Sequence, residues 1–258
     1  MNVSDADVAV LQDCLTLLEK WSVTWQLSIS IKKCSILMVG SGGSDAVYSF
    51  SDQAIESVDV VKDLGVLVDS KLNFFQHISD ITKKAHQRAS MILRCFLTRD
   101  PFVLIRAFKI YVRPLVEYAS PVWSPVSHAQ IEKLEKVQRR FTKRLFGLSK
   151  MTYAARLQYL KLQSLERRRL NQDLIMCYKI VRGMVDVNLS DFFTLSGSSI
   201  TRGHCYKISF HHCRVNARLN FFSNRVIAVW NSLPETVVTA PTIDIFKSLL
   251  MKLELPIV

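Results

Sequence analysis

Lysine and arginine are concentrated in one part of the chain, between residues 131 and 170. This stretch holds 12 of them against three glutamates, whereas the whole chain of 258 residues has 34 Lys and Arg, 22 Asp and Glu and a net charge of +12. Nine of the twelve excess positive charges therefore lie in forty residues. Such side chains neutralise phosphates, so this density favours a polyanionic partner, although a solvated helix face is the simpler alternative.

The spacing of these basic residues predicts that many of them share one face of a helix. At about 100° per residue, five of them fall within roughly 100° of helix arc, with Arg139 at the border. Apolar residues occupy a separate arc, so one face is expected to pack and the other to be cationic. The five basic residues are Lys133, Lys136, Arg140, Lys143 and Arg144. The apolar residues are Ile131, Leu134, Val137, Phe141 and Leu145.

A second basic cluster follows at residues 167–169. Residues of both clusters are predicted to track a nucleic acid backbone, which gives sequence-independent binding that weakens steeply with salt. Part of the block also fits a nuclear-import-like patch. The predicted nucleic-acid-binding residues are Lys133, Lys136, Arg139, Arg140, Lys143, Arg144, Arg167, Arg168 and Arg169.

Other chemistries find weaker support in the sequence. His204-Cys205 and His211-His212-Cys213 offer zinc-binding side chains, but their spacing is not that of a known finger, so no metal site is predicted. No serine lies in a Gly-x-Ser-x-Gly elbow, and no Gly-x-x-x-x-Gly-Lys loop is present. Six singly scattered cysteines are typical of reduced thiols in an intracellular protein, in the cytoplasm or nucleus.

Apolar periodicity predicts an α+β fold that is mainly α. A first helix over about 5–22 precedes short strand candidates, the clearest at 63–69, where a glycine indicates close approach of another backbone. Beyond residue 72 the apolar period changes from two to 3.6, and no apolar run approaches the ~20 residues of a membrane span. Residues 120–125, with two prolines, are expected to connect helices. The helices are predicted over about 74–97, 101–118, 131–147, 152–162, 164–183, 219–233 and 242–253.

Several short motifs follow one another along the chain. They are Lys62-Asp63-Leu64-Gly65-Val66, Val112-Arg113-Pro114-Leu115-Val116-Glu117-Tyr118, Val137-Gln138-Arg139-Arg140-Phe141-Thr142, Ser164-Leu165-Glu166, Thr201-Arg202-Gly203 and Trp230-Asn231-Ser232-Leu233-Pro234. In this order they resemble the reverse transcriptases of non-LTR (LINE-type, jockey-like or chicken-repeat-like) retrotransposons. The resemblance implies a small residual palm β-segment in 1–72, a helical thumb-like bundle in 73–185, and a C-terminal loop with closing helices in 186–258.

The resemblance also implies roles for two sites in the first 72 residues. Leu64, Gly65 and Val66 match the primer grip, where a glycine permits backbone contact with the primer end. A purely structural hairpin explains these residues equally well. Lys33 matches a lysine at the end of the palm, from which a cation helps pyrophosphate to depart, and a solvated turn beside Lys32 is the alternative.

The acidic centre of such polymerases has no counterpart in this sequence. The family is expected to join nucleotides with two metal ions held by an aromatic-x-Asp-Asp loop and an earlier aspartate, and this chain has no Asp-Asp dipeptide. We therefore expect a truncated reverse transcriptase (RNA-directed DNA polymerase) fragment that is inactive alone and keeps a basic surface for RNA or an RNA–DNA hybrid.

Partners and cofactors follow from this expectation. The fragment needs no cofactor, Mg²⁺ being expected only for the intact polymerase, whose missing portion is a candidate partner. No membrane partner is expected. The alternative is a host-retained helical protein-interaction module without nucleic-acid function.

Overall fold

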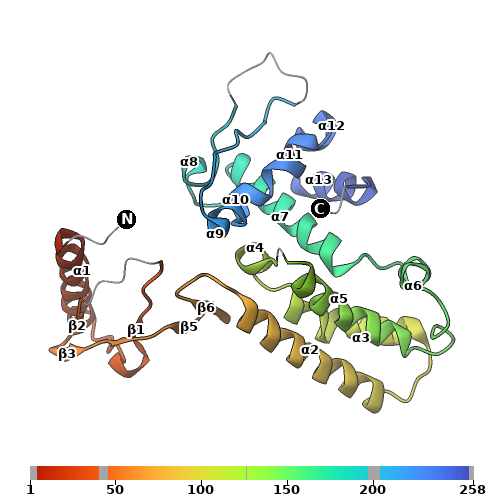
Figure 1. Cartoon of the computed structure of the whole chain (residues 1–258), viewed down its shortest axis with the longest axis horizontal. Helices are drawn as coiled ribbons and strands as arrows, with labels where there is room; N and C mark the ends of the chain where they lie inside the picture. Colours follow the sequence, from red (N-terminus) through yellow and green to blue (C-terminus); the bar gives the residue numbers. More distant parts are fainter. Residues whose placement is uncertain (1–4, 41–45, 126, 197–203, 256–258) are drawn as a thin grey trace. The chain divides into compact units, whose positions relative to one another are not determined.

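The computed structural model describes residues 5–40, 46–125, 127–196 and 204–255. The chain divides into two compact units, Met1–His77 and Ile78–Val258, each described separately below. The fold is mainly α with a few short strands, which confirms the predicted class (Figure 1). The motif at 201–203 lies outside the described residues. Among the helices described, none combines the length and apolar composition that crossing a membrane requires.

The first unit contains one long helix and several very short strands. Helix α1 (Asp5–Thr24) confirms the helix predicted over 5–22. Gln12 of α1 pairs with the backbone of Ser49: its Nε2 donates to the carbonyl oxygen and its Oε1 accepts from the amide, both at 3.0 Å. This pairing ties α1 to a small core of Tyr48, Phe50 and Ile55. The other elements are η1 (Ile31–Lys33), β1 (Ser35–Ile36) parallel to β4 (Glu56–Ser57), and β2 (Ser49–Phe50) antiparallel to β3 (Gln53–Ala54).

A tight hairpin replaces the single strand that was predicted over 63–69. Strands β5 (Val60–Asp63) and β6 (Val66–Asp69) are antiparallel, with Asp63 opposite Val66. The two residues between them, Leu64 and Gly65, have φ of 42° and 91°. Positive φ at both positions is the signature of a type I′ turn, which glycine adopts without steric cost. The strand prediction is confirmed for Val66–Asp69, but Leu64 and Gly65 form the turn, so Gly65 marks a turn rather than the approach of another backbone.

Three helices form the first part of the second unit: α2 (Phe75–Cys95), α3 (Pro101–Tyr111) and α5 (His128–Lys143). Phe108 of α3 and Phe141 of α5 meet in their core, with ring centroids 4.7 Å apart. Helix α3 ends earlier than the predicted residue 118, because Pro114 has no amide hydrogen and the chain turns into a 3₁₀ segment, η2 (Arg113–Val116). The stretch predicted as a connection contains one helical turn, α4 (Ser120–Trp123).

Helix α7 (Leu165–Val181) carries the second core of this unit and contacts α4, α5 and α13. Its Tyr178 stacks on Phe246 with ring centroids 4.3 Å apart, beside the fully buried Trp230. The helix predicted over 219–233 is interrupted at Phe221, whose ψ of 150° is extended. The remaining helices are α6 (Tyr153–Tyr159), α8 (Leu189–Phe192), α9 (Asn216–Leu219), α10 (Phe222–Arg225), α11 (Ile227–Ser232), α12 (Glu235–Val238) and α13 (Ile243–Lys252).

Candidate nucleic-acid interface

Helix α5 is held in one orientation by its apolar residues. Leu134, Val137 and Phe141 are 0–2% exposed, and each contributes about 1.5–3 kcal/mol through burial. Ser127 precedes the helix as its N-cap, and its hydroxyl accepts a hydrogen bond from the amide of Gln130. Burial of one face fixes which side chains the opposite face presents to solvent.

Four basic side chains of α5 and its C-cap are exposed, and we call them the α5 cationic face. They are Lys136, Arg140, Lys143 and Arg144. None of the four forms an ion pair with another described residue. The sequence has no Asp or Glu between Glu135 and Glu166. The positive charge of the α5 cationic face is therefore not neutralised by its neighbours along the chain.

A small pocket of about 150 Å³ lies between α2 and α5 at this face. Its polar lining consists of His86 and Ser90 from α2 with Arg140 and Arg144 from α5. Burial, and then the nearby charge of Arg140, lower the pKa of His86 from its usual 6.5. Two guanidinium groups, a hydroxyl and an imidazole are groups that donate hydrogen bonds to phosphate oxygens.

Lys133 and Arg139 are placed differently from the α5 cationic face. The half-buried Lys133 donates a 2.6 Å hydrogen bond to the hydroxyl of Ser79. Arg139 donates to both carboxylate oxygens of Glu132, at 2.7 and 3.0 Å, and lies over the ring of Tyr153. The hydrogen bond to Glu132 raises the pKa of Arg139. Both side chains therefore already donate hydrogen bonds to other residues of the second unit.

The three consecutive arginines predicted as a second basic cluster serve the fold. Arg167 donates to the carbonyls of Leu250 (3.3 Å) and Leu253 (2.7 Å) at the end of α13. Arg168 forms a two-pronged ion pair with Glu117, and Arg169 is 2% exposed. Arg167 and Arg169 are buried, and the partly exposed Arg168 is paired with Glu117, so we leave these arginines out of the candidate interface. Successive helical residues point about 100° apart, which is why adjacent arginines do not form one surface patch.

In the sequence, Glu135 counted only among the three glutamates of residues 131–170, and its structural role was missed. Glu135 is 4% exposed, and its carboxylate accepts from the amides of Leu165 and Glu166, each at 3.2 Å, and from the hydroxyl of Tyr153. It thereby caps the first turn of α7 from a neighbouring helix. Burial and the charge of Glu135 raise the pKa of Tyr153. The position of Glu135 about 40° beyond Ile131, at the edge of the apolar arc of the helix, was the available signal.

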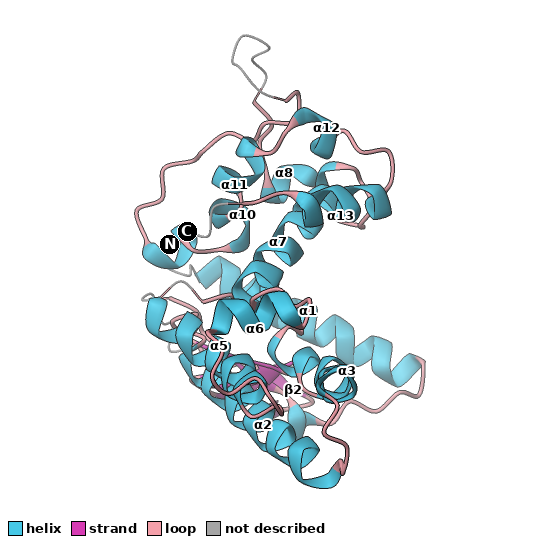
Figure 2. Cartoon of the chain, turned by 90° about the vertical axis from the view of Figure 1, so that its right-hand side faces the viewer, coloured by secondary structure: helices cyan, strands magenta, loops and turns pink. Residues whose placement is uncertain are grey.

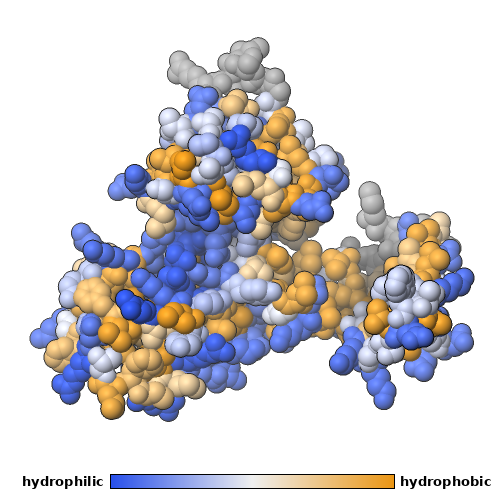
Figure 3. All heavy atoms as spheres, turned by 180° about the vertical axis from the view of Figure 1, so that it is seen from behind, coloured by the Kyte–Doolittle hydropathy of each residue, from blue (hydrophilic) through white to orange (hydrophobic). Residues whose placement is uncertain are grey.

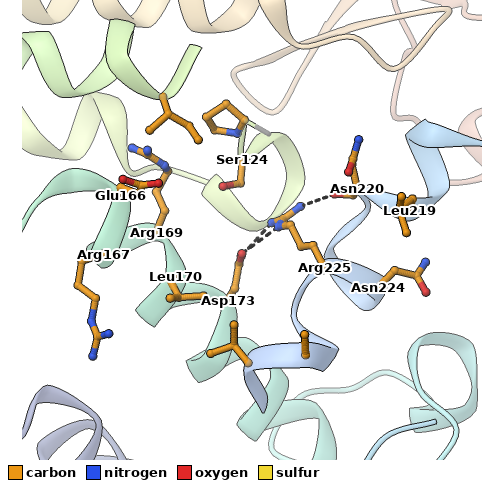
Figure 4. A pocket seen from close by; sticks show the side chains of 14 residues that line it. Ser124, Glu166, Arg167, Arg169, Leu170, Asp173, Leu219, Asn220, Asn224 and Arg225 are labelled. Carbon is orange, nitrogen blue, oxygen red and sulfur yellow. Dashed lines mark hydrogen bonds and ion pairs between the residues drawn. The ribbon is translucent and has the colours of Figure 1, made fainter. Parts of the chain in front are cut away.

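A second pocket, of about 430 Å³, lies between α7 and the C-terminal helices (Figure 4). Arg225 donates to both oxygens of Asp173 at 2.9 Å, and to the carbonyls of Pro121 (2.8 Å) and Asn220 (3.1 Å). One side chain thus joins α7, α4 and the chain around α9. Arg169 also lines the pocket, and its terminal nitrogens have no hydrogen-bond partner among the described residues.

Several residues of the histidine and cysteine motifs considered for zinc have hydrogen-bond partners within the protein. Nε2 of the buried His204 lies 3.0 Å from the carbonyl of Trp230, and Cys213 donates to the carbonyl of His211. The described residues contain no group of three or more His, Cys, Asp or Glu placed to hold a metal ion.

Of the family-implied sites in the first unit, Lys33 and Leu64 are exposed, whereas Val66 is not. Lys33 ends η1 with its side chain in solvent, and Leu64 at the hairpin tip is 84% exposed. Gly65 completes the turn and Val66 is buried beneath it.

Comparison with known proteins links the chain to mobile elements. It is 30% identical over 142 residues to uncharacterized protein B0403.1 of Caenorhabditis elegans, a match that covers 54% of this chain and 71% of that protein. It is 23% identical over 141 residues to the RNA-directed DNA polymerase from mobile element jockey of Drosophila melanogaster, and 26% over 138 residues to the probable RNA-directed DNA polymerase from transposon BS of the same fly.

The matches to the two fly polymerases cover 53% and 50% of this chain but only 15% of each polymerase. No family model and no solved structure matches the chain. The predicted relationship to retrotransposon reverse transcriptases is confirmed at this level, whereas the subtype and the C-terminal position remain predictions. The chain belongs to the same family as the Caenorhabditis elegans protein B0403.1, and it is a distant relative of the RNA-directed DNA polymerases of LINE-type mobile elements.

Proposed function

We propose that the second unit is a thumb-like nucleic-acid-binding unit, whose α5 cationic face contacts the phosphate backbone of RNA or an RNA–DNA hybrid without reading its sequence. The observation that carries this proposal is the division of one helix into a buried apolar side and four exposed basic residues outside any ion pair with described residues. Side chains of this type bind phosphates by releasing the counterions that surround them. Distant kinship with polymerases that copy RNA supports the choice of ligand.

The first test is a salt titration of binding to single-stranded RNA and to an RNA–DNA hybrid. Four phosphate contacts on a single strand give a slope of log K against log[salt] of about −3, because each contact contributes about −0.7. Fluorescence anisotropy between 50 and 400 mM salt measures this slope. Absent binding, or binding that salt does not weaken, would rule out the proposal.

The second test uses pH, because His86 lies beside two of the basic residues. Its pKa is lowered in the free protein by burial and by Arg140, with Arg144 facing the same pocket. A bound phosphate neutralises these charges and raises the pKa, so the complex holds a proton that the free protein releases. Affinity is expected to increase as the pH falls from 8 to 5.5, up to about tenfold for each unit of pKa difference.

The matched control for the pH test is His86→Gln, which keeps a polar side chain that does not titrate. In this variant the increase below about pH 7 should disappear, since the increase requires protonation of His86. An equal increase in wild type and variant would show that other groups cause it.

We also propose that the chain alone does not polymerise DNA, since its sequence has no Asp-Asp dipeptide to hold two metal ions. Magnesium-dependent extension of a primed RNA template by the purified chain would disprove this.

A second candidate function is a helical protein-interaction module. The observation that favours it is apolar surface on the first unit, where Val10, Leu17 and Trp21 of α1 are 63%, 63% and 48% exposed. Figure 3 shows hydrophobic residues on the surface of the molecule. Such patches often mark contacts between proteins. This function does not require nucleic acid binding, so the salt titration separates the two candidates.

A further inference from the structure

Three exposed aromatic rings lie at the end of the second unit where α5 terminates. Phe102, in the first turn of α3, pairs with Tyr159 of α6, with ring centroids 5.7 Å apart. Phe146, just beyond α5, lies under the guanidinium group of Arg99, 5.7 Å from the ring centroid. We call Phe102, Phe146 and Tyr159 the aromatic cluster. Figure 2 looks onto this end of the unit, with α3, α5 and α6 towards the viewer.

The aromatic cluster is exposed although the unit has cores that could take its rings. Phe102, Tyr159 and Phe146 are 51%, 49% and 67% exposed, whereas Phe108 of α3 is fully buried. Packing into a hydrophobic core therefore does not explain why these three positions are aromatic. Arg99 lies three residues before Phe102, so its contact with Phe146 places Phe146 near the start of α3, where Phe102 pairs with Tyr159.

Exposed basic residues lie close in sequence to the rings of the aromatic cluster, and Arg99 contacts Phe146 directly. Arg144, a member of the α5 cationic face, precedes Phe146 by two residues, and the exposed Lys161 follows Tyr159 by two. Asp100, the acid closest in sequence to Phe102, accepts a 2.8 Å hydrogen bond from its amide as the N-cap of α3. Rings that are flanked by cations fit a ligand that is both planar and anionic.

We propose that the aromatic cluster stacks unpaired bases of a nucleic acid whose backbone lies along the α5 cationic face. This inference rests on the proposed function and specifies its ligand as one with a single-stranded segment. Bases inside a duplex already stack on each other, whereas an unpaired base offers its face to an aromatic side chain. Every base has such a face, so the stacking does not depend on sequence.

The test replaces two rings by aliphatic side chains in the variant Phe102→Leu/Phe146→Leu. Leucine keeps the positions apolar, so the fold and the charges are preserved while stacking is lost. Affinity for a 20-nucleotide oligo(U) strand should fall at least about tenfold, since one stacked base contributes about 5- to 100-fold. Affinity for an RNA duplex of equal length should stay within about twofold, because a duplex offers no unpaired base.

A spectroscopic signal makes the test specific for stacking. The fluorescence of 2-aminopurine placed in the strand should be quenched on binding to the wild type and much less on binding to the double variant. Tyr159→Phe is the matched control, because it keeps the ring, and it should bind and quench as the wild type does.

Two outcomes would overturn the inference. In the first, the double variant binds the single strand as tightly as the wild type. In the second, its affinity for the duplex falls as much as its affinity for the strand, which would indicate a general apolar or protein-binding surface. The proposed function fails separately, if the wild type binds neither ligand.

Discussion

Replacing all four residues of the α5 cationic face by glutamine is expected to weaken RNA binding by about two to three orders of magnitude at 0.1 M salt. Each phosphate contact on a single strand contributes about −0.7 to the slope of log K against log[salt], so loss of four contacts makes this slope less negative by about 3. Because 0.1 M salt lies one decade below 1 M, the affinity at 0.1 M falls by a corresponding factor of about two to three orders of magnitude. Glutamine keeps the helix propensity and solubility of the face. Anisotropy titrations at several salt concentrations measure both the affinity and the slope.

The control for this experiment changes the net charge equally at another part of the second unit. Arg214→Gln, Arg218→Gln, Lys247→Gln and Lys252→Gln remove four exposed cations that lie outside α5. If binding depends on the α5 cationic face, this control keeps most of the affinity and of the salt slope. Equal losses in both variants would show that net charge alone attracts the RNA, and the proposed interface would be wrong.

The sequence predicted the orientation of α5 because helical geometry repeats regularly. Leu134, Val137 and Phe141 recur at helical spacing, and the structure buries all three. The same periodicity predicted α2, α7 and α13, whose apolar sides face the cores. Patterns of this kind depend on local geometry, which the order of residues specifies directly.

Contacts between distant segments were not predictable in the same way. Arg167 is bound by carbonyls more than 80 residues away, and Glu135 caps a helix that begins 30 residues later. A sequence shows the charges of such residues but not their partners, so Arg167 was expected on the surface and the role of Glu135 was not foreseen. The sequence singled out Gly65 for its backbone, but the turn also depends on the positive φ of Leu64, which the sequence does not reveal.

The aromatic cluster could not be predicted from the sequence either. Phe102 and Tyr159 have the residue types of a core, and only packing decides that they stay exposed while Phe108 and Phe141 are buried. No spacing rule separates the two pairs, because a small domain has more apolar residues than its core holds. The aromatic cluster could therefore be identified only from the structure.

Asp173→Ala is expected to lower the free energy of unfolding of the second unit by about 3–5 kcal/mol. Asp173 is 4% exposed and accepts both hydrogen bonds from Arg225, which itself ties α7 to α4 and to the chain at Asn220. Removal of the carboxylate leaves the Arg225 charge partly buried without its partner, and also takes a nearby negative charge from Arg169. Urea denaturation followed by the fluorescence of the buried Trp123 and Trp230 measures the loss.

The matched control is Asp244→Ala, which removes a carboxylate from an Asp–Lys ion pair at the surface. Asp244 lies 3.4 Å from Lys247, and its side chain is 87% exposed. Water screens such a pair, so its loss should change the free energy of unfolding by at most about 1 kcal/mol. If the two substitutions destabilise the unit equally, burial adds nothing to the Asp173–Arg225 pair, and the pocket beside it does not hold the C-terminal helices on α7. A large difference between them, in contrast, would show that the buried Asp173–Arg225 pair holds α10 on α7, so that Arg225 serves the fold rather than binding RNA.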